Sequence, residues 1–242
     1  LHCALTQREN PDPALKGADF SADPDHLKGY ARAEDIKATY GNMADEYWDK
    51  ITTAADSVMD YVLLYDGEPI QAVYHSCSIG GTESAENVWQ ASVPYLVPVE
   101  SEGDLVAPAA EAEVTFTSAE MRALLTAAFD GLVLGDNPAL WLSPVSYTES
   151  GYIMDIKVGN LTVTGKEVRA ALDLVLCILL LIGGVGLYYL GMYGDCFTIH
   201  TQGYGHGVGL SQYGADYMAR QGADFKEILT HYYTGVELAV LD

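Results

Sequence analysis

The sequence predicts a mixed α+β fold with a β-rich core and flanking helices, and three observations lead to it. Short runs of β-branched and aromatic residues are separated by turn signals such as Asp66-Gly67. Apolar residues recur at helical spacing in the middle of the chain and near its end. The chain has 242 residues, of which 49% are hydrophobic and 19% charged, so it can bury a sizeable core. A disordered chain, a collagen-like chain and a disulfide-rich miniprotein are therefore excluded.

We expect one domain over residues 1–242, built from four consecutive parts. Residues 1–42 form a loop-rich entry with short helical pieces. A helix, a hairpin and a polar motif follow over 43–100. An acidic connection and a helix occupy 101–144, and 145–242 form a β-rich part with a second polar motif and C-terminal helices.

A helix and a hairpin are predicted in the second of these parts. In residues 43–58 one helical face collects apolar side chains, namely Tyr47, Ile51, Ala54, Ala55 and Val58. The sequence YVLLYDGEPIQAVYHSCS then places two strand-like runs on either side of Asp66-Gly67, which predicts a hairpin.

The third part is predicted to be a connection followed by a helix. Residues 101–113 are acidic and alanine-rich, which favours an exposed connection. Thr117 and Glu120 form a capping box, and the apolar residues behind it share one face: Met121, Leu124, Leu125 and Ala128.

The last part is predicted to contain strands and then two helices. Residues 145–170 alternate between apolar and polar, with turns at Ser150-Gly151 and Gly159-Asn160, so we expect strands there. Gly222 ends the first C-terminal helix, SQYGADYMARQ. Asp224 begins the second, DFKEILTHYY, with Glu227 three residues on.

An uncharged run of 21 residues separates Asp173 from Asp195. Its length and hydropathy fit a membrane span, which we keep as an alternative. The run is interrupted by Gly183-Gly184 and is flanked by strand-like sequence. We therefore favour a buried hairpin of two apolar strands that turns at these glycines.

Charge and cysteine content exclude several classes of protein. Twelve Lys and Arg residues against 34 Asp and Glu give a net charge of −22. Nucleic acid and anionic lipid are bound through clustered basic side chains, so we expect neither as a partner. The four cysteines form no Cys-x-x-Cys pair, which excludes a zinc ribbon and a thioredoxin motif.

Two short segments concentrate the residues that could carry chemistry. The first motif, Tyr74–Glu83, gathers hydroxyls, an imidazole and a carboxylate around a glycine turn. The second motif, Gly203–Ala215, surrounds His206 with glycines that allow close backbone approach. A purely structural alternative is that these glycines let a strand pack on a helix, with His206 hydrogen-bonded inside.

Together the two motifs resemble the SpoIID/LytB family of bacterial stage II sporulation protein D lytic transglycosylases and related amidase enhancers. The resemblance rests on YHSCSIGGTESAENVW…PYL, followed by GYGHGVGLSQYGADYMARQG…ILTHYYTGV. The segments GEPIQAVYHS and TGKEVR fit as well. It covers roughly residues 20–240 and is least diagnostic over 101–150.

The resemblance implies a groove that binds glycan strands. Its predicted substrate-binding residues are Ser76, Ser78, Thr82, Glu83, Tyr95, His206, Ser211, Gln212 and Tyr213. Trp89 could stack on sugar rings with Tyr95, or pack in the core instead. A purely structural role is the alternative for Glu83.

The family cleaves peptidoglycan glycan strands without water, leaves a 1,6-anhydro sugar end and needs one carboxylic acid. Its catalytic glutamate belongs to a Glu-Met-Pro segment that we expect upstream of Leu1, so we assign no catalytic residue here and leave enzyme activity open. We expect no cofactor and no metal site, because of the family's zinc ligands only His26 remains. A third alternative is a metal hydrolase that uses His75, Cys77 and His206.

The resemblance also implies partners and a location. We expect peptidoglycan glycan strands as the ligand, other cell-wall hydrolases as further partners, and cell-wall remodelling during sporulation as the role. The expected location is the extracytoplasmic cell envelope, with a membrane anchor outside these residues. The alternative function is a non-catalytic peptidoglycan-binding module that enhances an amidase.

Overall fold

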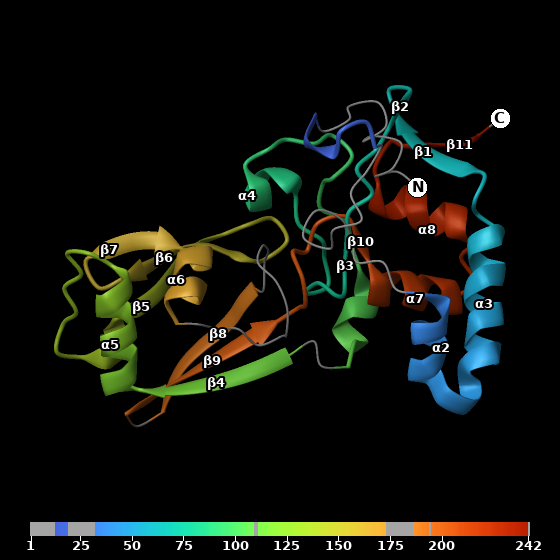
Figure 1. Cartoon of the computed structure of the whole chain (residues 1–242). Coiled ribbons are helices and arrows are strands. Elements are labelled where there is room, and N and C mark those ends of the chain that lie inside the picture. The colour runs from blue at the N-terminus through green and yellow to red at the C-terminus, as the bar shows by residue number, and fades with distance from the viewer. Residues whose placement is uncertain (1–12, 19–31, 109–110, 173–185, 194, 242) are drawn as a thin grey trace. The chain divides into compact units, whose positions relative to one another are not determined.

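The computed structural model describes residues 13–18, 32–108, 111–172, 186–193 and 195–241. They combine helices with several small sheets, which confirms the α+β prediction (Figure 1). The chain divides into two compact units. Unit 1 comprises Leu1–Ala72 and Gly235–Asp242, and unit 2 comprises Val73–Thr234.

Unit 1 combines a helical hairpin with a small sheet. Its helices are the 3-10 turns η1 (Pro13–Leu15) and η2 (Gly41–Met43) and the α-helices α2 (Ala33–Tyr40) and α3 (Ala44–Asp56). Its sheet has the order β11-β1-β2, from Glu237–Val240, Tyr61–Tyr65 and Glu68–Pro69, with antiparallel pairing.

The hairpin predicted at Asp66-Gly67 is confirmed. Both turn residues have positive φ, 51° and 83°, as a tight two-residue turn between twisted strands requires. Only two residues of β2 pair with β1, however. The remainder of the predicted second run continues into unit 2.

The helical hairpin of unit 1 departs from the prediction in two ways. Residues 33–40, predicted within the loop-rich entry, form α2, whose first turn carries Glu34 and Asp35 where a helix favours negative charge. The helix predicted over 43–58 is confirmed as α3, yet none of its residues is buried. Its apolar face, including Tyr47 and Ile51, is exposed.

Unit 2 holds the remaining elements. Its helices are α4 (Ala85–Trp89), α5 (Ser118–Ala128), α6 (Gly165–Ala171), α7 (Gln212–Arg220) and α8 (Phe225–Tyr232), with 3-10 turns η3 (Glu102–Val106) and η4 (Pro138–Leu140). Its strands are β3 (Tyr74–His75), β4 (Glu111–Thr117), β5 (Leu142–Tyr147), β6 (Ile153–Val158), β7 (Leu161–Thr164), β8 (Gly186–Tyr193), β9 (Cys196–Gln202) and β10 (Leu210–Ser211).

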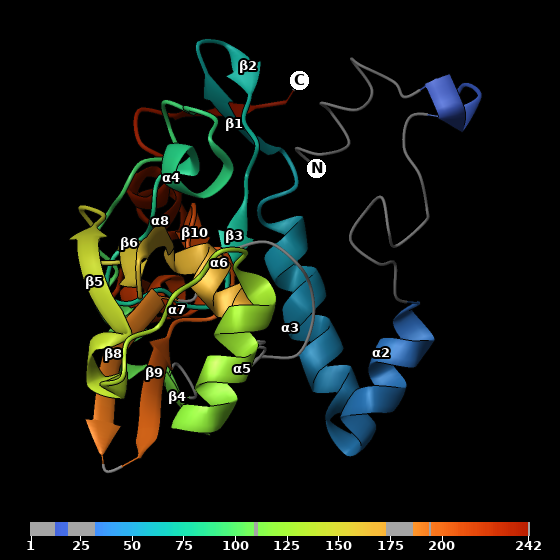
Figure 2. The same cartoon turned by 90° about the vertical axis from the view of Figure 1, so that its left-hand side faces the viewer.

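Three sheets organise unit 2. Strands β4, β9 and β8 form one antiparallel sheet in that order, and β5, β6 and β7 form another (Figure 1). Helices α5 and α6 lie side by side (Figure 2) and contribute Met121, Leu125 and Val168 to a buried apolar cluster. The third sheet is the parallel pair β3 and β10.

The helices that carry strong start signals follow the prediction. The Thr117–Glu120 capping box begins α5, and Asp224 with Glu227 begins α8. The helix predicted before Gly222 is α7. The strands predicted over 145–170 are confirmed as far as Thr164, but residues 165–171 form α6, because Thr164 and Glu167 make a further capping box.

The predicted exposed connection over residues 101–113 is wrong in its first half. Residues 102–106 form η3, in which Gly103 and Asp104 are buried, and Ser101 is buried before them. From Glu111 the chain forms strand β4. The alanine-rich composition gave no indication that Ser101, Gly103 and Asp104 pack inside unit 2.

Part of the uncharged run can be compared with the prediction. The turn at Gly183-Gly184 lies outside the described residues. Residues 186–193 form strand β8, which pairs with β9. Residues 173–185, where the other strand of the predicted hairpin would lie, are outside the described residues, so the hairpin stays a prediction. In the part of the chain that the structure describes, no helix is long and apolar enough to cross a membrane.

Candidate functional site

The two polar motifs meet through their backbones in unit 2. Tyr204 and Cys77 form an antiparallel bridge, with Tyr204 N donating to Cys77 O at 2.8 Å and Cys77 N donating to Tyr204 O at 3.2 Å. Glu83 N donates to Gly207 O at 2.7 Å, and β3 pairs with β10 (Figure 1). Segments more than a hundred residues apart thus form one continuous arrangement.

Glycines in the second motif make this approach possible. Gly205 has φ of 109°, and a Cβ there would lie 2.8 Å from the Cβ of His75. Gly209 has φ of 72°, and a Cβ there would overlap the carbonyl oxygen of Val73. These glycines therefore allow close packing, but against strand β3 and Val73 before it, and not between a strand and a helix as the structural alternative had it.

Asp104 joins the motifs at their centre. It is 0% exposed, and its Oδ2 accepts hydrogen bonds from Ser78 N at 2.7 Å and from Ser78 Oγ. Its Oδ1 accepts a hydrogen bond from Ser211 Oγ. One buried carboxylate therefore connects the first motif, through Ser78, to the second, through Ser211.

Ser211 also links Asp104 to the start of α7. It is the N-cap of the helix, and its Oγ accepts a hydrogen bond from Gly214 N at 3.1 Å. Tyr213 N donates to Ser76 O at 3.1 Å. Gln212 is exposed and the side chain of Tyr213 is 37% exposed, so the first turn of α7 presents an amide and a phenol to solvent.

Two more predicted site residues turn inward. Thr82 Oγ1 accepts a hydrogen bond from Val99 N at 2.9 Å. Glu83 is buried, and its Oε1 accepts from Ser84 N at 2.7 Å and from Asn87 Nδ2 at 2.9 Å. Glu83 Oε2 is buried with no hydrogen-bond partner among the described residues.

The two histidines take opposite tautomers when neutral. His75 Nδ1 lies 3.2 Å from Val208 O, so this nitrogen carries the proton and donates. His206 Nδ1 accepts from Val208 N at 3.1 Å, which leaves the proton on Nε2. Burial lowers the pKa of His75, against the opposing influence of the Asp104 charge and the Val208 hydrogen bond.

His206 lies between His75 and Trp89. Its ring centroid is 5.8 Å from that of His75 and 5.0 Å from that of the Trp89 indole. His206, Trp89, Tyr95 and Ser76 are each half-buried. The ring contact gives Trp89 a packing role beside the second motif, and its stacking on a sugar stays a prediction.

The predicted site residues thus fall into two groups. The buried ones, with hydrogen bonds inside the protein, are Ser78, Thr82, Glu83 and Ser211. The accessible ones are Ser76, Tyr95, His206, Gln212 and Tyr213. The structure brings both motifs together, and substrate contact by any of these residues stays a prediction.

The described part of the chain has no group of side chains with the geometry of a metal site. No three His, Cys, Asp or Glu side chains in that part are arranged to hold a metal ion. His75 and Cys77, named for a metal hydrolase, are both buried. His26 lies outside the described residues.

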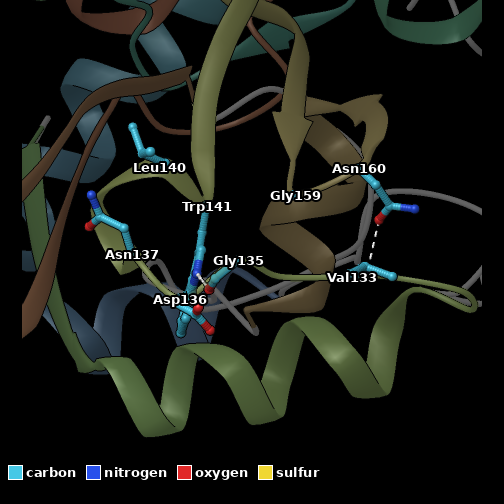
Figure 3. Close-up of a pocket in the computed structure, with 8 residues that line it drawn as sticks. All are labelled: Val133, Gly135, Asp136, Asn137, Leu140, Trp141, Gly159 and Asn160. Carbon is cyan, nitrogen blue, oxygen red and sulfur yellow. Dashed lines mark hydrogen bonds between the residues drawn. The ribbon is translucent and has the colours of Figure 1, made fainter.

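A pocket of about 430 Å³ lies elsewhere in unit 2, beside the loop before β5 (Figure 3). Its floor is Trp141, whose Nε1 donates to Gly135 O at 2.7 Å, and Asn160 Oδ1 accepts from Val133 N at 2.7 Å. None of the predicted site residues lines it. The side chains of Asn137 and Asn160 hydrogen-bond to backbone groups around the pocket, and the pocket does not extend the candidate site.

Asp104 is the residue that sequence reasoning missed. It lies in the segment predicted to be exposed, among other acidic residues that are solvated. The available signal was Gly103 beside it: a side chain there would overlap the Cβ of Tyr217 on α7. That overlap is visible only in the structure, and no local pattern in the sequence names Tyr217 as the partner.

Comparison with known proteins gives relatives over most of the chain, and no family model matches it. The chain is 31% identical to stage II sporulation protein D of Bacillus subtilis over 88% of its length, and 31% identical to that of Bacillus amyloliquefaciens over the same share. It is 25% identical to an amidase enhancer of Bacillus subtilis over 79% of its length.

The chain spans 58% of the length of the two sporulation proteins and 33% of the amidase enhancer. Identity of 31% over 88% of the chain agrees with the resemblance that the two motifs carry. The chain therefore belongs to the SpoIID/LytB family.

Proposed function

We propose that this chain binds the glycan strands of peptidoglycan in the cell envelope and acts in cell-wall remodelling during sporulation. The observation that carries the proposal is the exposed first turn of α7, held against the first motif by Tyr213 N and Ser76 O. Gln212 and Tyr213 offer an amide and an aromatic face, the groups that suit neutral sugar rings. Relatives named for sporulation support the same role.

The reaction proposed for the family domain is glycan-strand cleavage to a 1,6-anhydro end. Its leaving oxygen must be protonated, and a positioned acid contributes roughly 10²- to 10⁴-fold. Neither Glu83 nor Glu86 falls on the family's glutamate segment, and one oxygen of Glu83 is tied to Ser84 and Asn87. We therefore propose that residues 1–242 alone bind glycan strands without cleaving them.

Chromatography of peptidoglycan digests tests this proposal. Purified sacculi are incubated with the 242-residue protein, and both co-sedimentation and released muropeptides are measured. We expect co-sedimentation and no anhydro-muropeptides. Anhydro products from this chain would mean that an acid inside it does the chemistry, and failure to sediment with sacculi would overturn glycan binding.

A second function is favoured by the amidase enhancer among the relatives. In that case the chain is a binding module that assists a partner amidase. Adding the chain to an amidase acting on sacculi separates the two: a rise in released stem peptides supports the enhancer role. An unchanged amidase rate, with glycan binding retained, favours the transglycosylase branch.

A further inference from the structure

Asp104 is a buried charge held by hydrogen bonds. It is fully buried, and it takes part in none of the ion pairs between described residues. Its carboxylate instead accepts from the backbone and hydroxyl of Ser78 and from the hydroxyl of Ser211. A buried carboxylate costs free energy unless its oxygens are satisfied, so this arrangement ties both serines to one place.

The hydrogen bonds of Ser211 connect Asp104 to the exposed first turn of α7. Ser211 Oγ, besides donating to Asp104, lies 3.2 Å from Ser76 O and accepts from Gly214 N. Tyr213 N also donates to Ser76 O. The position of Asp104 therefore fixes the first turn of α7, and with it the direction in which Gln212 and Tyr213 face solvent.

From this geometry we infer that Asp104 is a positioning residue: it sets the placement of Gln212 and Tyr213 and so the affinity for glycan strands. The inference rests on the proposed function for its ligand. Asp104 itself does not contact the glycan, because no part of it is exposed.

Two substitutions of Asp104 compare a buried side chain that keeps hydrogen bonds to the serines with one that makes none. In Asp104→Asn the amide oxygen can still accept from Ser78 N, and the amide nitrogen can donate to Ser211 Oγ, whose own proton then turns to Ser76 O. Asp104→Ala removes every bond. Ser118→Ala is the matched control, because it removes a partly buried hydrogen bond, from Ser118 Oγ to Asp195 O, that involves neither motif.

The experiment measures affinity and structure side by side. Binding of purified soluble glycan strands is titrated at a temperature at which circular dichroism shows each variant folded. We expect Asp104→Ala to weaken binding about tenfold, Asp104→Asn to stay within about twofold of wild type, and Ser118→Ala to bind as wild type. Where Asp104→Ala does not fold, Ser78→Ala takes its place, with a smaller loss in the same direction.

Nuclear magnetic resonance gives a second readout that does not depend on a ligand. The amide signals of Gln212 and Tyr213 should shift in Asp104→Ala and not in Ser118→Ala. Wild-type affinity in Asp104→Ala, or unmoved signals at Gln212 and Tyr213, overturns the positioning role. Absence of glycan binding by the wild-type protein overturns the proposed function alone, and the amide signals then decide the positioning role.

Discussion

Gly214 lies where the first turn of α7 meets two hydroxyl groups that bond to each other. Ser101 Oγ and Tyr232 Oη are 2.8 Å apart, and a Cβ on Gly214 would overlap both oxygens. Burial also raises the pKa of Tyr232 to about 12, so its phenol stays protonated at neutral pH. A single hydrogen atom at position 214 thus allows α7 to pack beside α8.

Gly214→Ala should destabilise unit 2 by about 2–3 kcal/mol, since the methyl group must displace one hydroxyl from a filled space. Gly135→Ala is the control, because a Cβ there meets nothing within 4 Å. Urea denaturation of both variants measures the difference. Equal stability of the two variants would contradict the packing of α7 against Ser101 and Tyr232.

His75 gives the candidate site a pH dependence. Burial lowers its pKa below the ordinary 6.5, so the unfolded chain binds a proton more readily than the folded one. The stability that neutral His75 contributes is full above about 6.5 and is lost as the pH falls below it. Desolvation by burial is the cause of the lowered pKa, and the buried Nε2 has no hydrogen-bond partner among the described residues.

We expect the denaturant concentration at the midpoint of unfolding to be lower at pH 5 than at pH 7.5. The decrease should be smaller in His75→Gln, because glutamine has no proton to gain. A glutamine amide can still donate toward Val208 O. The same fall in both proteins would show that other groups control the pH dependence. Titration of the His75 ring signals by magnetic resonance gives the direct check.

At the scale of elements, the strength of local signals decides what can be predicted. Capping residues and apolar spacing predicted α5, α7 and α8. The residues that cap the start of a helix lie within four consecutive positions, so a local pattern reveals them. Residues 165–170 alternate weakly, and the sequence predicts a strand there, although Thr164 and Glu167 carry the same capping signal. Helix α2 was missed because its sequence, AEDIKATY, has no strong apolar period.

Pairing over long distances could not be predicted from local patterns. The two motifs were identified from their residue types and order, but nothing in either motif specifies the β3–β10 pairing. Asp104 illustrates the limit further, because its burial follows from the packing of η3 and not from its neighbours in sequence. From the sequence, the hydroxyls of Ser78, Thr82 and Ser211 are expected to face a ligand. In the structure they are buried and hydrogen-bonded inside the protein, again because of packing between segments that are distant in sequence.

Helix α6 allows a test at this scale. Glu167 Oε2 accepts from Thr164 N and Thr164 Oγ1, each at 2.8 Å, and these hydrogen bonds hold the pKa of Glu167 below its ordinary 4.5. Thr164→Ala should cost about 1 kcal/mol at pH 7 through the lost cap. Part of that loss should disappear as the pH falls below about 4.5, where the carboxylate gains a proton.

Thr126→Ala, at an exposed position in the last turn of α5, is the control and should be neutral or slightly stabilising. Denaturant titrations at pH 7 and pH 3 measure both variants. A Thr164→Ala loss that is as large at pH 3 as at pH 7 would show that the glutamate side of the capping box contributes nothing.

For the whole molecule, the strong negative charge limits the kind of contact that a ligand can make. With 34 acidic against 12 basic residues, long-range attraction for an anionic polymer is absent. Recognition must then come from neutral groups at short range, and the exposed Gln212 and Tyr213 are such groups on unit 2. Their placement, and not the charge of the chain, is expected to decide binding.

The most direct test of this account is to map a soluble peptidoglycan glycan fragment onto the protein by magnetic resonance. We predict that the largest shift changes fall on Ser76, Gln212 and Tyr213, and that Tyr213→Ala abolishes them. Saturating shifts confined to the pocket beside Trp141, or no shifts in unit 2 at any fragment concentration, would contradict glycan binding by the joined motifs.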